Sequence, residues 1–125
     1  MEKDNTFKKN VIQEKSYSFA LRIVKMYQYL VKTKREKILA NQVLRSGTSI
    51  GANVEEAIGA YSSKEFLSKI SIAYKEARET KYWLRLLRDA NYLEPKQVES
   101  LLVDCEEVLK ILGSIIRTSR LKVKQ

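Results

Sequence analysis

The alternation of apolar and polar residues predicts four amphipathic helices joined by short turns. Apolar positions recur every three or four residues, which is the period of a helix that buries one face. The expected helices cover residues 10–32, 33–60, 62–91 and 95–118. Four such helices with tight connections pack as an up-down-up-down bundle, so we expect an all-α fold with one domain over residues 10–118.

Local signals mark where the helices begin. The tetrapeptides that start at Thr33 and Ser62 have the sequence of a capping box, in which a hydroxyl accepts a hydrogen bond from the backbone amide three residues later. They predict the starts of the second and third helices. Pro95 suits the first turn of the fourth. Residues 1–9 and 119–125 are polar and basic, and we expect them to be flexible tails.

Each helix has one face that we expect to lie in the core. In the first helix this face is Ser16, Tyr17, Ala20, Ile23, Val24, Tyr27, Leu30 and Val31, flanked by Phe19 and Met26. In the third helix it is Phe66, Ile70, Ala73, Ala77, Thr80, Leu84 and Leu87. In the fourth helix it is Val98, Leu101, Leu102, Cys105, Val108, Leu109, Leu112, Ile115 and Ile116.

The second helix contains a stretch, residues 45–57, that is rich in small residues. Glycine inside a helix costs about 0.5–1 kcal/mol relative to alanine, so two glycines here need a reason. Gly47 and Gly51 are four residues apart on the apolar face. We interpret this stretch as the most enclosed helix of the bundle, in which the missing side chains let a neighbouring helix approach closely.

The third helix carries a second apolar stripe, about 140° from its core face. Ile72, Trp83 and Leu86 lie on it. A helix in a four-helix monomer needs only one wide apolar face, and Trp is enriched at interface anchors. The stripe therefore predicts a contact between subunits, the alternative being that Trp83 covers the edge of its own monomer.

The amino-acid composition excludes several classes of function. The 125-residue chain contains no histidine, so Ser-His-Asp and Cys-His catalysis and a Glu-x-x-His di-iron site are impossible. Glu76 and Glu79 lie one turn apart where Arg45 of the second helix can meet them, an arrangement that a structural ion-pair network explains as well as catalysis does. We expect no enzyme activity, no metal and no cofactor.

The chain has few signs of an extracytoplasmic or membrane location. Cys105 has no partner for an internal disulfide and we expect it to be a small buried hydrophobe. No apolar run is long enough to cross a membrane, and the first residues do not resemble a signal peptide. We therefore expect a cytoplasmic protein.

The net charge of +9 favours a polyanionic partner. The fourth helix is acidic outside, whereas cations gather on the first and third helices and at the turn after the first. The candidate phosphate-binding residues are Arg22, Lys25, Lys32, Lys34, Arg35, Lys37, Lys75, Arg78, Arg85 and Arg88. Tyr29 and Tyr82 are placed to stack on unpaired bases. The alternative is a solvated surface that keeps the protein soluble.

Three segments together carry a resemblance to a known family. They are SYSFALRIVKMYQYL (residues 16–30), LRSGTSIGANVEEA (44–57) and ISIAYKEARETKYWLRLL (70–87). They resemble the four-helix bundle proteins first noticed as reading frames in the intervening sequences of bacterial 23S ribosomal RNA genes. A more distant similarity is to the accessory variability protein of diversity-generating retroelements. The resemblance implies a homopentameric ring, but it supplies no biochemical role and no catalytic residues.

Two functions remain open from the sequence. One is a non-catalytic oligomer that binds structured RNA or an RNA–DNA hybrid through its basic strips. The other is a scaffold or accessory subunit that binds a partner protein without nucleic acid, through the stripe of Ile72, Trp83 and Leu86.

Overall fold

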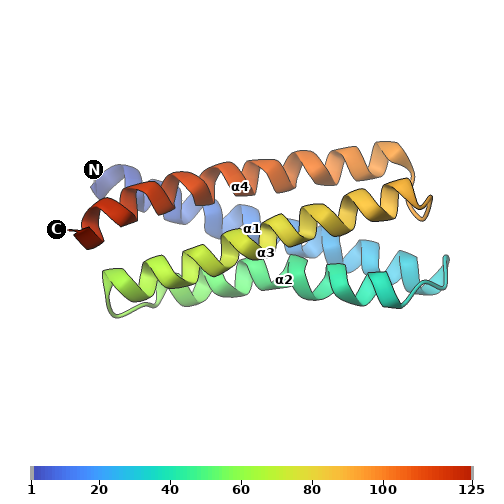
Figure 1. Ribbon diagram of the computed structural model, residues 1–125, viewed down its shortest axis with the longest axis horizontal. Coiled ribbons are helices and arrows are strands. Elements are labelled where there is room, and N and C mark those ends of the chain that lie inside the picture. The colour runs from blue at the N-terminus through green and yellow to red at the C-terminus, as the bar shows by residue number, and fades with distance from the viewer. Residues whose placement is uncertain (1, 125) are drawn as a thin grey trace.

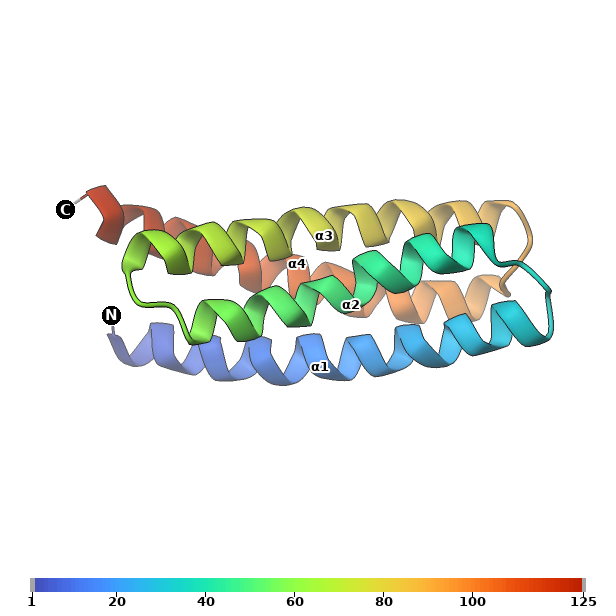
Figure 2. The same cartoon turned by 90° about the horizontal axis from the view of Figure 1, so that it is seen from below.

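A computed structural model describes residues 2–124 and folds them into four helices (Figure 1). The helices are α1 (Glu2–Lys32), α2 (Ile38–Ile58), α3 (Ser63–Asp89) and α4 (Pro95–Lys124). Contacts join α1 to α2, α2 to α3, α3 to α4 and α4 back to α1, which closes a ring of neighbours. The expected all-α, up-down-up-down bundle is confirmed, and Figure 2 shows the alternating directions of the helices.

One of the two expected capping boxes forms. The Ser62 hydroxyl accepts a hydrogen bond from the Glu65 amide at 3.0 Å, and α3 begins at the next residue. The prediction of a capping box at Thr33 is wrong, because α2 begins only at Ile38. The Thr33 amide still donates to the last turn of α1, and Arg35 then adopts a left-handed conformation (φ 54°) that cannot belong to a helix.

The outer helices are longer than the sequence analysis expects. The expected start of the first helix at residue 10 is wrong, since α1 begins at Glu2, and α4 continues to Lys124. Both of these helix ends lie at the same end of the bundle (Figures 1 and 2). The ammonium of Lys8 donates to the Ser114 hydroxyl at 2.7 Å, and that of Lys9 lies 4.5 Å from the centre of the Phe66 ring. These contacts join the start of α1 to α3 and α4, which favours helical structure before residue 10.

The buried faces follow a seven-residue repeat. All seven expected core residues of α3 are buried, and those of α4 are too, except the half-buried Leu109. In α1 the buried residues are Ile12, Ser16, Phe19, Ile23, Met26 and Leu30. The assignment of Tyr17 to the core is wrong, as its side chain is 65% exposed. A strict 3.5-residue repeat moves the buried seam onto Phe19 and Met26 and away from Tyr17.

Close packing against α1 requires a glycine at only one of the two glycine positions of α2. A Cβ atom added at Gly47 would lie 2.9 Å from two carbons of the Ile23 side chain, which is closer than real contacts allow. At Gly51 the nearest atom would be the Ser16 carbonyl oxygen at 3.5 Å, an ordinary contact. The room-making role is therefore confirmed for Gly47. Separately, none of the helices described over residues 2–124 is long and apolar enough to cross a membrane.

Candidate nucleic-acid interface

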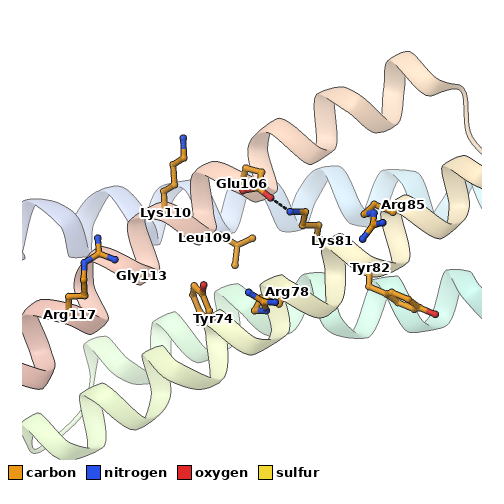
Figure 3. Close-up of a pocket in the computed structure, with 10 residues that line it drawn as sticks. All are labelled: Tyr74, Arg78, Lys81, Tyr82, Arg85, Glu106, Leu109, Lys110, Gly113 and Arg117. Carbon is orange, nitrogen blue, oxygen red and sulfur yellow. Dashed lines mark ion pairs between the residues drawn. The ribbon is translucent and has the colours of Figure 1, made fainter.

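A basic groove of about 750 Å³ runs between α3 and α4 (Figure 3). Its lining residues are Tyr74, Arg78, Lys81, Tyr82, Arg85, Glu106, Leu109, Lys110, Gly113 and Arg117. The helices hold these side chains beside the buried seam, at the positions that flank the core residues of each helix. We refer to this feature as the α3–α4 groove.

Gly113 lies on the floor of the α3–α4 groove. The Tyr74 ring and the Arg117 guanidinium lie beside its position, at distances that a Cβ atom would also allow. A Cβ atom placed there would lie 3.6 Å from Arg117 Nη1 and 3.8 Å from Tyr74 Cε2. Leu109, one turn earlier on α4, continues the apolar part of the floor (Figure 3).

The groove has a large excess of positive charge. Five cations and a single carboxylate line it. That carboxylate, Glu106, forms an ion pair with Lys81, whose Nζ lies 2.5 Å from Glu106 Oε1. Among the side chains described in this structure, no carboxylate pairs with the other four cations, Arg78, Arg85, Lys110 and Arg117. An anion in the groove would meet these donors without first displacing an acid.

A second hollow of about 270 Å³ continues the groove toward the C-terminal end of α4. It shares Tyr74, Gly113 and Arg117 with the first, and adds Lys75 and Arg120. Arg85, at the other end of the groove, is ten residues beyond Lys75 on α3. At about 1.5 Å per residue the basic surface therefore spans about 15 Å along the bundle.

The structure divides the candidate residues of the sequence analysis into three sets. Lys75, Arg78 and Arg85 come together in the groove and its continuation. Arg22 and Arg88 lie outside it and are held by acids. Arg22 Nη1 lies 2.6 Å from Asp104 Oδ2, whereas Arg88 donates to Asp89 and Glu99 at 2.9 and 2.8 Å. The hydrogen bonds to Asp89 and Glu99 also raise the pKa of Arg88.

The remaining candidates lie on the α1 side of the bundle, either between α1 and α4 or at the α1–α2 turn. Lys25 lines a separate hollow of about 540 Å³ between α1 and α4, together with Tyr29. Exposed cations around the α1–α2 turn complete the set: Lys32, Lys34, Arg35 and Lys37. This turn lies at the same end of the bundle as the C-terminal end of α3, as expected (Figure 2).

The groove also contains residues that the sequence analysis missed. Lys81 and Tyr74 of α3 were not among the expected binding residues. Neither were Lys110 and Arg117 of α4, because the fourth helix was judged acidic on its outer face and Arg117 was counted with the basic C-terminal tail. The signal that could have found them is the seven-residue spacing of Lys110 and Arg117, with Gly113 between them. That spacing places both cations on one side of α4.

A different polar network lies on the opposite side of α3, facing α2. Arg45 Nη1 lies 3.1 Å from Glu76 Oε2, and its Nη2 pairs with Glu79. Trp83 Nε1 donates to Glu79 Oε2 at 2.9 Å. The Trp83 hydrogen bond, followed by those from Arg45, lowers the pKa of Glu79. The expected meeting of Arg45 with both carboxylates is confirmed, and it makes Glu79 a structural anion.

The second apolar stripe of α3 borders this network. Ile72 is 40% exposed, whereas Trp83 and Leu86 are half-buried, and the Trp83 ring packs against the core. The Trp83 ring also meets the neighbouring Tyr82 ring nearly at right angles, with centroids 5.0 Å apart. Trp83 thus covers the edge of its own bundle, as the alternative expects, while Ile72 stays exposed. The contact between subunits stays a prediction.

The groups that could carry nucleophilic or metal chemistry are few. Cys105 is buried, and this burial raises the pKa of its thiol to about 12. A neutral, enclosed thiol is a poor nucleophile. Among the side chains that the structure describes, residues 6–123, there is no cluster of three acidic or cysteine side chains that could hold a metal ion.

Comparisons with known proteins agree with the geometry of the bundle. A family model described as 23S rRNA-intervening sequence protein matches residues 8–114. The chain is also similar to a crystal structure of a protein of unknown function from the S23 ribosomal protein family of Bacteroides thetaiotaomicron. The two share 49% sequence identity with a TM-score of 0.87, over 88% of this chain and 98% of that one. None of the curated proteins matches the chain.

Proposed function

The chain belongs to the 23S rRNA-intervening sequence protein family, and we propose that it is a non-catalytic protein that binds nucleic acid along its α3–α4 groove. One observation carries the proposal. Five cations converge on one concave surface that contains a single carboxylate, already paired with Lys81. A surface of this kind attracts phosphate groups and releases their counterions.

The arrangement of the cations supports binding along a phosphate backbone. Arg78 and Arg85 are seven residues apart on α3, and Lys110 and Arg117 have the same separation on α4. Each pair therefore spans about 10 Å along its helix, on facing walls of the groove. Arginine presents a planar fork of donors that suits phosphate oxygens. Three arginines and one lysine, arranged in two pairs along the groove, favour a chain of phosphates over a single small anion.

The absence of an evident catalytic group in the groove supports a binding role. Its only carboxylate, Glu106, is paired with Lys81, and the thiol of Cys105 lies in the core. A general base near neutral pH needs a suitably tuned pKa and an open approach to substrate. The groove residues are instead cations and tyrosines, which serve binding and stacking.

The test is the affinity of charge-reversal variants for a labelled RNA. We expect wild-type affinity to fall steeply between about 50 and 200 mM salt. Arg78→Glu with Arg85→Glu should reduce affinity at least about tenfold at low salt, since two phosphate contacts become repulsive. The comparison variant is Lys34→Glu with Lys37→Glu, which changes the net charge equally at two candidates of the α1–α2 turn, outside the groove. It should lower the affinity less, and an equal loss would contradict the groove as the binding site. Failure of the wild type to bind RNA or DNA at low salt would contradict the proposal.

A second candidate function is self-assembly or partner binding through the α2–α3 face. The observation that favours it is the exposed side chain of Ile72 beside Trp83 and Leu86. A homo-oligomer, with the pentameric ring as the expected form, would bury this apolar surface and repeat the basic groove around one axis. Light scattering of the purified protein tests this candidate, and a monomer at all concentrations is the contrary result.

A further inference from the structure

We infer that the α3–α4 groove binds unpaired nucleotides in preference to a duplex, with Tyr82 as the platform on which one base stacks. This inference rests on the proposed function and names the form of nucleic acid that the groove selects. It follows from the shape of the groove and from the exposure, neighbours and fixation of the Tyr82 ring.

The shape of the groove is the first consideration. The cations line a hollow between two helices, with Leu109 and Gly113 at its base. A duplex presents its phosphates on a convex surface and is usually contacted by a helix or ribbon that enters one of its grooves. A single backbone can lie within a hollow of this size and reach cations on both walls, whereas a duplex would contact only the rims.

The Tyr82 ring is exposed and lies between two phosphate-binding candidates. Its side chain is 54% exposed. Arg78 precedes it by four residues and Arg85 follows it by three, so all three share one side of α3. A base stacked on Tyr82 would therefore have a guanidinium within reach of the phosphate on either side. Proteins that bind single strands combine these two features, a basic groove and aromatic platforms.

The Tyr82 ring is also held in place by a contact with the neighbouring Trp83 ring. It meets the Trp83 ring at an angle of 71°, with centroids 5.0 Å apart. Trp83 is fixed by its hydrogen bond to Glu79, and Glu79 is paired with Arg45 of α2. A single neighbouring ring can cover at most one face of Tyr82, so Trp83 leaves the other face open. A ring that is already positioned loses less conformational freedom when a base stacks on it.

Tyr82 is a better platform than the other aromatic side chain of the groove. Tyr74 is half-buried, and its ring lies over Gly113 on the floor. Less of its surface is therefore open to a base. A duplex cannot use either ring, because its bases are already stacked on one another, so an exposed tyrosine in a basic groove is useful mainly to an unpaired strand.

The experiment compares three ligands by fluorescence anisotropy: a labelled RNA single strand of about 12 nucleotides, the matching duplex, and labelled inorganic polyphosphate. We expect the single strand to bind more tightly than the duplex. Tyr82→Ala should weaken single-strand binding by about 5-fold to 100-fold and leave polyphosphate binding unchanged, since stacking needs a base. Tyr82→Phe should retain affinity. Tyr61→Ala, which removes a 98% exposed tyrosine from the turn before α3, is the matched control.

The outcomes separate this inference from the proposed function. If the duplex binds as tightly as the single strand, or if Tyr82→Ala and Tyr61→Ala behave alike, the inference is overturned while salt-dependent binding by the groove still stands. If no nucleic acid binds at low salt, the proposed function fails and the inference fails with it. Circular dichroism confirms that each variant remains helical, so a loss of affinity reports on the groove.

Discussion

The two glycines of α2 face α1 with different amounts of space. Gly47 lies against Ile23, a fully buried β-branched side chain that has little freedom to move. Gly51 lies against the Ser16 backbone at an ordinary contact distance. The sequence predicts close packing at both positions, because the two glycines lie four residues apart on the same face of the helix. Only the facing residue on α1 distinguishes them.

We predict different effects on the free energy of unfolding when these two glycines are replaced by alanine. Gly47→Ala should lower the free energy of unfolding by about 1–3 kcal/mol, because overpacking outweighs the gain in helix propensity. Gly51→Ala should leave it unchanged or raise it by up to about 1 kcal/mol. Urea denaturation measures both. Gly47→Ala at least as stable as the wild type would contradict the packing described here.

At the scale of the helix, local sequence signals succeed where the backbone around them agrees. Ser62 caps α3 because its own backbone is extended (φ −145°, ψ 161°), which aims its hydroxyl at the Glu65 amide. Thr33 has the same sequence signal, but its own amide still belongs to α1. The left-handed residue Arg35 then separates the two helices. The capping-box sequence alone does not reveal whether Thr33 ends the first helix or begins the second.

The apolar face of α3 toward α2 leads to a prediction about assembly. Ile72→Asp should weaken self-association without unfolding the protomer, because this side chain is 40% exposed and outside the core seam. Val103→Asp is the matched control on the outer surface of α4, where the side chain is 64% exposed. Light scattering at equal concentrations measures both. Equal oligomer mass for both variants and the wild type would show that this face is not the interface.

At the scale of the whole molecule, the packing of the helices decides which cations are paired with acids and which are not. Between α1 and α4, Lys15 pairs with Glu107 and Arg22 pairs with Asp104. The basic first helix and the acidic fourth helix thus offset each other, so Arg22 is already held by an acid. Between α3 and α4 the cations outnumber the acids, and the groove retains its charge.

The sequence predicts the fold more completely than the site, for a physical reason. The buried faces follow from periodicity along one chain segment, so the core residues of α3 can be named in advance. The groove depends on which faces of two helices meet. Lys75, Arg78 and Arg85 were identifiable from α3 alone, whereas Lys110 and Arg117 become part of the site only when α4 is placed beside it.

The most direct test of the α3–α4 groove is a gain in affinity from removal of its one acid. Glu106→Gln releases Lys81, so RNA should bind more tightly, with a salt dependence steeper by up to about one counterion. Glu107→Gln changes the net charge equally at the next residue, but that side chain pairs with Lys15 of α1. We predict that only Glu106→Gln raises affinity at low salt. Equal effects of the two substitutions, or no effect of either, would contradict the assignment of RNA binding to the groove.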